Sequence, residues 1–277
     1  MTQDRDYWAV IPVYDEAPTI REVALRALRT LPRVIVVDDG SCDGTAEALT
    51  GLPVVLLRNR RNRGKAMSLW RGFRYALSRG ARGVVTLDGD GQHAPEDITG
   101  LLAAARRMPG QLLIGARSRH ARRRAPLRGR ARYYANRFAD FWISWAAGYP
   151  IVDSQSGLRF YPRELLHKVK VRHGKSRSFV FESEVLIEGA YLGFEARAVP
   201  VTARPRLGPR PSHFRPLVDI ARITRMVAGR LLARRLYLAG LYRSLRRPVR
   251  PWMNRTTRSI PPRRRKAPRA SSDPRRH

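Results

Sequence analysis

The chain has 277 residues, of which 43% are hydrophobic, so it is long enough and apolar enough to bury a full core. Its 55 lysines and arginines against 22 acidic residues give a formal net charge of +33, which predicts attraction to nucleic acid or anionic lipid. The one cysteine, Cys42, excludes a disulfide framework within the chain. No signal-peptide pattern opens the sequence, and no run of about 18 apolar residues predicts a membrane span.

Strands and helices are predicted to alternate along most of the chain. The apolar runs predict strands at 7–13, 33–37, 54–57, 83–87, 112–114 and 194–201. Helices are predicted at 19–31, after the capping residues Ser41 and Asp43, from Lys65 through Ser78, and from Pro95 to about Arg107. This order predicts an α/β fold with a mostly parallel central sheet and helices on both faces.

Acidic residues follow three of the predicted strands in pairs, and ligands of such sheets bind beyond the carboxyl ends of the strands. The pairs are Asp15 with Glu16, Asp38 with Asp39, and Asp88 with Asp90. Acids and glycines are common in turns, so capping alone would explain one pair. Three pairs indicate an edge that binds a ribose, a base and a metal diphosphate. Mg²⁺ or Mn²⁺ suits Asp88 and Asp90, because these cations prefer oxygen ligands.

Glycine-rich phosphate loops of the P-loop or dinucleotide type are missing from the sequence, so the metal would carry much of the diphosphate charge. Four blocks of the sequence resemble the family 2 glycosyltransferases, which have a GT-A fold: 10–16 (VIPVYDE), 36–41 (VVDDGS), 62–65 (NRGK) and 87–93 (LDGDGQH). Within that family the chain most resembles the polyprenyl-phosphate sugar synthases of the dolichyl-phosphate mannose synthase type. Asp15 stands where the family commonly has Asn, and Ala66 where Gly often follows the lysine.

The resemblance implies roles for individual residues. It places the metal on Asp88, Asp90 and Gln92, and it gives catalytic roles to Asp90, Arg117 and Glu182. The donor-binding residues that it implies are Pro12, Tyr14, Glu16, Asp38, Asp39, Lys65, Asp88, Gln92, Asp153, Gln155 and Arg215. As alternatives, Asp153 and Gln155 form a polar turn before a short strand, and Glu182 favours the positive end of a helix.

A basic stretch from Arg117 leads into a helix that is rich in aromatic residues. Arginines interleaved with aromatic side chains suit single-stranded nucleic acid, and they equally suit a lipid phosphate beside its isoprenoid chain. The resemblance favours the lipid phosphate, with Arg117 as the acceptor-binding arginine. The second acceptor-binding residue is left open among Arg128, Arg130 and Arg132.

The sequence predicts three regions: a glycosyltransferase domain at 1–215, one amphipathic helix at 216–245, and a basic, disordered tail at 246–277. The helix places apolar residues on one face and arginines on the other. This pattern predicts contact with an anionic membrane surface, while packing on the core or on a second subunit remains an alternative.

The function predicted is metal-dependent, inverting transfer of a sugar from a nucleotide donor to a polyprenyl phosphate, at the cytoplasmic face of a membrane. The donor is open between GDP-mannose and a UDP-hexose. A phosphate acceptor needs no strong general base, and Asp153, Glu182 and Glu184 offer no convincing one. The alternative is a hydroxyl acceptor on a lipid or small molecule, and a remote alternative is a basic nucleic-acid-binding protein without a recognised motif. No Gln-x-x-Arg-Trp block is present, which argues against polymer synthesis.

Overall fold

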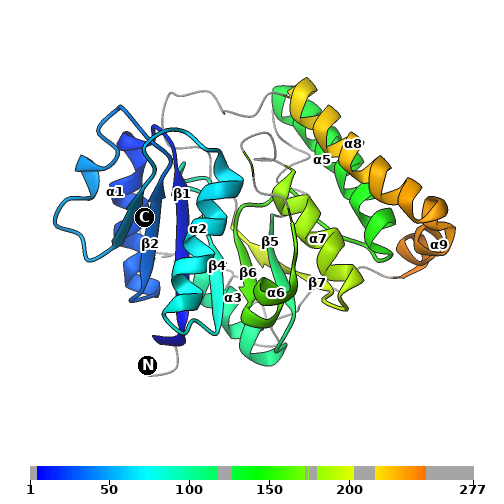
Figure 1. The fold of residues 1–277 in the computed structure, drawn as a ribbon, viewed down its shortest axis with the longest axis horizontal. Coiled ribbons are helices and arrows are strands. Elements are labelled where there is room, and N and C mark those ends of the chain that lie inside the picture. Colours follow the sequence, from blue (N-terminus) through cyan, green and yellow to red (C-terminus); the bar gives the residue numbers. More distant parts are fainter. Residues whose placement is uncertain (1–4, 118–126, 172–173, 175–179, 203–215, 248–277) are drawn as a thin grey trace, which may run out of the picture.

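A seven-stranded sheet forms the centre of the computed structural model (Figure 1). The structure describes residues 5–117, 127–171, 174, 180–202 and 216–247, and at 127–132 and 216–219 it describes the backbone alone. The strand order is β3-β2-β1-β4-β6-β5-β7. The strands are β1 (Tyr7–Val13), β2 (Val34–Asp38), β3 (Val55–Arg58), β4 (Gly83–Thr86), β5 (Leu112–Arg117), β6 (Arg159–Pro162) and β7 (Ala196–Val201). All neighbouring pairs are parallel except those of β6, which runs antiparallel to β4 and β5.

Helices cover both faces of the sheet, as the sequence predicts. The helical segments are α1 (Ala17–Thr30), η2 (Glu47–Leu49), α2 (Lys65–Ser78), α3 (Asp97–Arg107), α5 (Leu127–Ala147), α6 (Arg163–Lys168), α7 (Phe181–Tyr191), α8 (Pro216–Ala233), η4 (Arg235–Tyr237) and α9 (Leu238–Arg246). Successive side chains of a strand point to opposite faces, so Ala9 and Ile11 pack with α1 and α3, while Val10 packs with α2.

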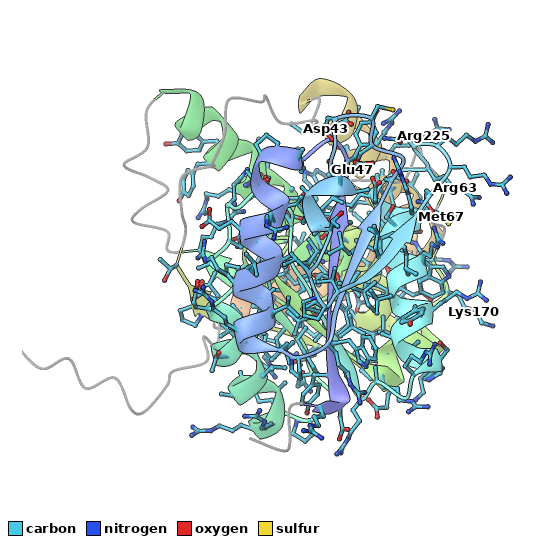
Figure 2. All side chains as sticks on the ribbon, turned by 90° about the vertical axis from the view of Figure 1, so that its left-hand side faces the viewer. Asp43, Glu47, Arg63, Met67, Lys170 and Arg225 are labelled. Atoms are coloured by element: carbon cyan, nitrogen blue, oxygen red, sulfur yellow. The ribbon has the colours of Figure 1, made fainter. Side chains whose placement is uncertain are left out.

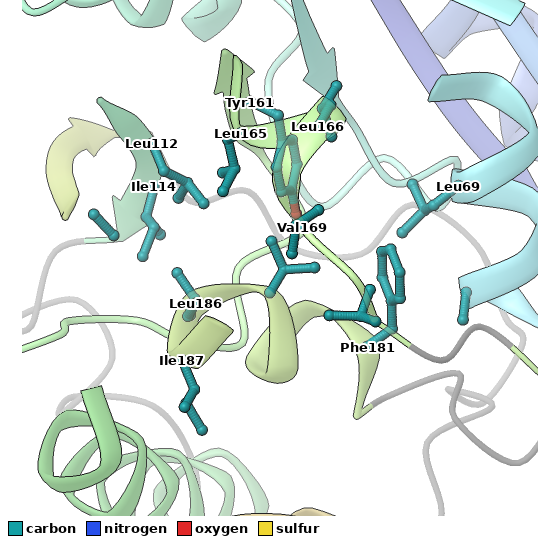
Figure 3. Close-up of a cluster of buried hydrophobic side chains, with 14 of the residues drawn as sticks. Leu69, Leu112, Ile114, Tyr161, Leu165, Leu166, Val169, Phe181, Leu186 and Ile187 are labelled. Carbon is teal, nitrogen blue, oxygen red and sulfur yellow. The ribbon is translucent and has the colours of Figure 1, made fainter. Parts of the chain in front are cut away.

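The larger hydrophobic core lies on the α2 side of the sheet and reaches α5, α6, α7 and α8. Leu112 and Ile114 of β5 belong to it, together with Leu165 of α6 and Leu186 of α7 (Figure 3). Helices α5 and α8 lie side by side on the outside of this layer, with α9 at their far end (Figure 1). Within the described part of the chain, no helix has both the length and the apolar character needed to cross a bilayer.

The prediction of a helix after Ser41 is wrong, because that segment forms turns and only the short 3₁₀ helix η2. Side-chain hydrogen bonds compete with helix formation there. Asp43 accepts from the backbone N–H and hydroxyl of Thr45 (3.1 and 2.5 Å) and from the N–H of Ala17 (3.1 Å). Figure 2 shows Asp43 and Glu47 at the end of the molecule where α1 begins.

The prediction of a single long helix at 216–245 is also wrong, because the chain breaks between α8 and α9. Three successive residues have left-handed backbone angles there, with φ of 50° at Arg235, 64° at Leu236 and 43° at Tyr237. Trp145 of α5 donates from Nε1 to the Leu236 carbonyl at 2.9 Å. This contact with α5 stabilises the break between α8 and α9. The 3.6-residue period of the apolar residues continues across the break, so it could not predict where the helix ends.

Candidate active site at the carboxyl edge of the sheet

One edge of the sheet collects the polar residues that the sequence singles out. The parallel strands β1, β2, β4 and β5 all end at this edge. Because β6 runs the other way, the loop that precedes it, 153–158, lies at the same edge. The residues after β4 and β5 therefore meet a loop from much later in the chain.

Asp38 and Asp39, at the end of β2, hold the neighbouring loops. Asp38 is fully buried, accepts from the N–H and hydroxyl of Ser41 (2.9 and 2.5 Å), and pairs with the Arg58 guanidinium at 3.1 Å. Asp39 accepts from the Asn59 amide (2.7 Å) and from the N–H groups of residues 63 and 64 (2.9 and 2.7 Å). Both residues thus shape the loops on which the predicted donor site depends.

The loop after β1 is tied to its neighbours in the same way. The backbone N–H of Asp15 donates to the Ser41 hydroxyl, and that of Glu16 to the Thr45 hydroxyl, both at 2.9 Å. Thr19 donates from its hydroxyl to the Gly89 carbonyl at 2.7 Å, which joins the start of α1 to the loop after β4. Pro12, Tyr14 and Glu16, predicted to bind the donor, are partly exposed at this edge.

A partly buried ion cluster joins three residues that are far apart in sequence. The Lys65 ammonium, at the start of α2, lies 2.7 Å from Asp88 Oδ1 and 3.1 Å from Glu182 Oε2 at the start of α7. Burial disfavours the charged form of both partners, but the attraction between them outweighs it. It raises the pKa of Lys65 above its ordinary value and lowers the pKa of Asp88. Lys65 and Asp88 therefore stay charged and attract each other.

Asp90 and Gln92 form the other half of the loop after β4. The Gln92 side chain donates to Asp90 Oδ2 at 2.7 Å, and its backbone N–H donates to Oδ1 at 3.1 Å. Gly157 packs directly against Asp88, since a Cβ at Gly157 would lie only 2.6 Å from Asp88 Oδ1. Within the described residues, no group of three or more His, Cys, Asp or Glu side chains could by itself hold a metal.

Arg117, at the end of β5, is paired with Asp153 from the loop before β6. Its Nε donates to Asp153 Oδ2 at 2.9 Å and its Nη2 to Oδ1 at 2.8 Å. Burial opposes the charge on Arg117, but the hydrogen bonds to Asp153 outweigh it and raise the pKa of Arg117. Asp153 is fully buried, so the structure turns this carboxylate toward Arg117 and away from solvent.

Arg159 and Asp140 shape the site although they are not among the residues predicted from the sequence. Arg159 is fully buried and donates to the carbonyls of Ser156 and Glu182, both at 2.8 Å, and of Ser154. Asp140 on α5 accepts from the N–H groups of Asp153 (3.2 Å) and Ser154 (2.8 Å). In the sequence, Arg159 stands between two apolar residues, Leu158 and Phe160, in a short predicted strand. An arginine in such a position indicates a buried charge that must have partners, because charged residues are rarely buried without them.

Other predicted residues have clear surroundings. Gln155 donates to the hydroxyls of Ser154 (3.3 Å) and Ser183 (3.2 Å). Glu184 does not join the ion cluster, because it pairs with Arg230 of α8 at 3.0 Å. Arg215 and the side chains of Arg128, Arg130 and Arg132 lie outside the described residues.

His93 is the buried titratable group of the loop after β4. It is 2% exposed, and burial lowers its pKa from about 6.5 to about 4 although Asp88 acts in the opposite direction. The imidazole is therefore neutral at neutral pH and adds no charge beside the ion cluster.

The sequence of this chain matches a protein family and several of its curated members. The family model described as Glycosyl transferase family 2 matches residues 8–170. The chain is 30% identical over 207 residues to the polyprenol monophosphomannose synthase of Mycolicibacterium smegmatis, covering 71% of this chain and 77% of the relative. It is also 30% identical over 208 residues to the undecaprenyl-phosphate mannosyltransferase of Micrococcus luteus, covering 70% and 81%.

A solved structure has the same fold. The crystal structure of glucosyl-3-phosphoglycerate synthase from Mycobacterium tuberculosis, in complex with Mn²⁺, UDP and glucosyl-3-phosphoglycerate, superimposes with a TM-score of 0.58 at 22% identity. The match covers 83% of this chain and 80% of that one. The predicted GT-A fold is thus confirmed, with a mostly parallel sheet between two helical layers.

Proposed function

This chain belongs to glycosyl transferase family 2 and is a glycosyltransferase, and from that premise we propose that it moves a sugar from a nucleotide donor to a polyprenyl phosphate with inversion at the anomeric carbon. The observation that carries the proposal is that Asp88, in the loop after β4, and Arg117, at the end of β5, lie at the same edge of the sheet. An acidic group for the donor and a basic group for an anionic acceptor are thus neighbours.

The carboxylates of the site favour a phosphate acceptor over a hydroxyl. Asp153 pairs with Arg117, Glu182 with Lys65, and Glu184 with Arg230. A carboxylate that is already held by a cation is poorly placed to take a proton from an acceptor hydroxyl. A phosphate oxygen is already ionised at neutral pH and attacks without a base, so these three pairs do not hinder the reaction.

The donor half of the site would hold Mg²⁺ or Mn²⁺ through Asp88 and Asp90. Two carboxylates suit such a cation, which commonly completes its shell with substrate phosphates and water. The site also already attracts a cation, because Lys65 lies on Asp88 and Glu182. When bound, the metal would neutralise charge on the leaving diphosphate, while Lys65 keeps its own positive charge beside it.

Donor binding measured by calorimetry tests the first part of the proposal. We expect one of GDP-mannose, UDP-glucose and UDP-N-acetylglucosamine to bind in the presence of Mn²⁺, and Asp90→Asn to weaken that binding about 10-fold. Asp6→Asn is a suitable control, because Asp6 precedes β1 at the opposite edge of the sheet and pairs there with Arg82 at 3.8 Å. Binding that is equally tight without metal, or in Asp90→Asn, would contradict the metal role.

Transfer to the acceptor tests the second part. Incubation of the enzyme and donor with polyprenyl phosphate should give an acid-labile lipid phosphosugar, whereas a hydroxyl acceptor would give an acid-stable glycoside.

We further propose that the enzyme works at the cytoplasmic face of a membrane, on which it rests peripherally.

The exposed apolar residues of α9 support this membrane contact. Leu238, Tyr242 and Leu245 are 65, 56 and 66% exposed and share one face of the helix, beside exposed arginines at 243 and 246. By contrast, the apolar residues Ile223, Val227 and Leu231 of α8 are buried in the core. The membrane face expected for one long helix is therefore assigned to α9, where apolar and basic side chains adjoin.

Vesicle binding checks this assignment. Replacing Leu238, Tyr242 and Leu245 together with Ser should weaken binding to phosphatidylglycerol vesicles at least about 10-fold, because each side chain removed from water contributes roughly 1.5 to 3 kcal/mol when fully buried. The matched control replaces Leu25, Leu56 and Leu192, each 39% exposed on other elements, with Ser. Equal binding of the two triple variants would refute the role of α9.

A further inference from the structure

We propose that Asp153 is a positioning residue that holds one edge of the Arg117 guanidinium and thereby presents the other edge to the phosphate of the acceptor. This inference rests on the proposed function and extends it to a residue that the family resemblance places on the donor side. The pair is a side-on fork, in which Nε and Nη2 of Arg117 each donate to a different oxygen of Asp153, at 2.9 and 2.8 Å. The backbone N–H of Arg117 adds a third hydrogen bond to Oδ2 at 3.0 Å.

The second edge of the guanidinium is left for a ligand. A guanidinium has five N–H donors, so the two N–H groups of Nη1 and the second of Nη2 remain after the side-on fork is formed. Among the described residues, none accepts a hydrogen bond from them. The Arg117 side chain is 12% exposed, so it is not closed off from solvent although Asp153 is. A bidentate phosphate can bind two of the remaining donors at once.

Asp153 is itself fixed, as a positioning residue must be. Its backbone is left-handed, with φ of 55°, a conformation that few residues other than Gly adopt but that Asp tolerates. Asp140 of α5 accepts from the N–H groups of Asp153 and Ser154, and the Asp153 carbonyl accepts from the N–H of Ser156 at 2.9 Å. The side chain is fully buried, so the carboxylate has no route to solvent without moving this loop.

The arrangement explains why a paired arginine can still serve an anionic substrate. Asp153 offsets the charge of Arg117 while the site is empty, which lowers the cost of keeping a guanidinium away from water. It uses the side-on edge only, so a phosphate does not have to displace it. Arg117 then meets the acceptor in a fixed orientation, and no rotamer freedom is lost on binding.

Steady-state kinetics with farnesyl phosphate, a short polyprenyl phosphate, test the inference. We expect Asp153→Asn to raise the KM for farnesyl phosphate about 10-fold, because an amide cannot accept both hydrogen bonds, while the KM for the nucleotide sugar changes less than about 2-fold. The matched control is Asp6→Asn. Asp6 pairs with Arg82 at 3.8 Å at the amino end of β1, so its removal should change neither constant.

A double-mutant cycle separates positioning from a general effect on the fold. If Asp153 acts through Arg117, the Asp153→Asn change should have no further effect on the KM for farnesyl phosphate in an Arg117→Lys background. An unchanged KM in Asp153→Asn would overturn this inference alone. Absence of any transfer to farnesyl phosphate by the wild-type enzyme would overturn the proposed function and this inference together.

A measurement on the wild-type protein covers the case in which Asp153→Asn does not fold. With ¹⁵N-labelled arginine, the Nε–H resonance of Arg117, identified by its loss in Arg117→Lys, should remain slow to exchange when farnesyl phosphate is added. That result means that Asp153 keeps its edge while the ligand binds the other. Loss of protection on binding would mean that the phosphate replaces Asp153, and it would overturn the inference.

Discussion

Replacing Gly157 with Ala should lower the kcat/KM of sugar transfer at least about 100-fold, because a displacement of about 1 Å in an active site is enough for such a loss. The Cβ would lie 2.6 Å from Asp88 Oδ1 and closer still to Oδ2, so the carboxylate has to move. Asp88 would then lose its 2.7 Å contact with Lys65, and the donor side of the site would lose its geometry. The φ angle of Gly157 is not positive, so the clash alone causes the effect.

Gly100→Ala is the matched control for this variant. Gly100 lies in α3, where nothing lies within 4 Å of the added Cβ, so the change should leave the rate unaltered and raise stability by about 0.5–1 kcal/mol. Rates and melting temperatures of both variants would be compared. A Gly157→Ala enzyme that keeps wild-type kcat/KM would show that Asp88 need not lie where the structure places it.

Replacing Arg159 with Met should lower the free energy of unfolding by about 3–5 kcal/mol, the usual loss when one member of a buried charged network is removed. A buried ion pair can often be replaced by apolar residues when both partners are changed. Here the partners are backbone carbonyls of residues 154, 156 and 182, which no substitution removes. All three would lose this donor, and the loop before β6 would lose one of its connections to α7.

Urea denaturation of Arg159→Met and of Arg26→Met measures the effect against a control. Arg26 is also mostly buried, but its carboxylate partners Glu22 and Glu96 are 61 and 55% exposed and regain water when it is removed. Arg26→Met should therefore cost less, about 1 kcal/mol or below. Equal losses in the two variants would mean that the carbonyls around Arg159 find other partners.

Much of the fold could be predicted from the sequence, because the first five strands are short apolar runs between turn residues. The run 7–13 matches β1, and 83–87 overlaps β4 with one residue of difference at its end. The place of β6 could not be predicted. Periodicity identifies a strand but not its neighbours, and β6 pairs with β4 across the tertiary fold in the antiparallel direction.

For the candidate site, the sequence predicted which residues share an edge of the sheet but not which of them pair with one another. Acids at the ends of parallel strands must share one edge, so the order of strands and helices was enough to place Asp38, Asp88 and Asp90 there. The ion pairs could not be predicted, since Lys65 and Glu182 are 117 residues apart and Arg117 and Asp153 are 36 apart. No spacing rule links such pairs, because only the packing of α7 and of the loop before β6 brings them together.

The reversed direction of β6 has a consequence for how such an enzyme can change its substrates. The loops after β1, β2 and β4 come from residues before α3, which begins at Asp97, whereas Arg117 and Asp153 come from the end of β5 and the loop before β6. Under the proposed function, the donor would therefore contact mainly the earlier segment, with Glu182 of α7 as a later addition, and the acceptor phosphate would contact the later one. Variation near Arg117 and Asp153 would then be expected to change the choice of acceptor more than the choice of donor.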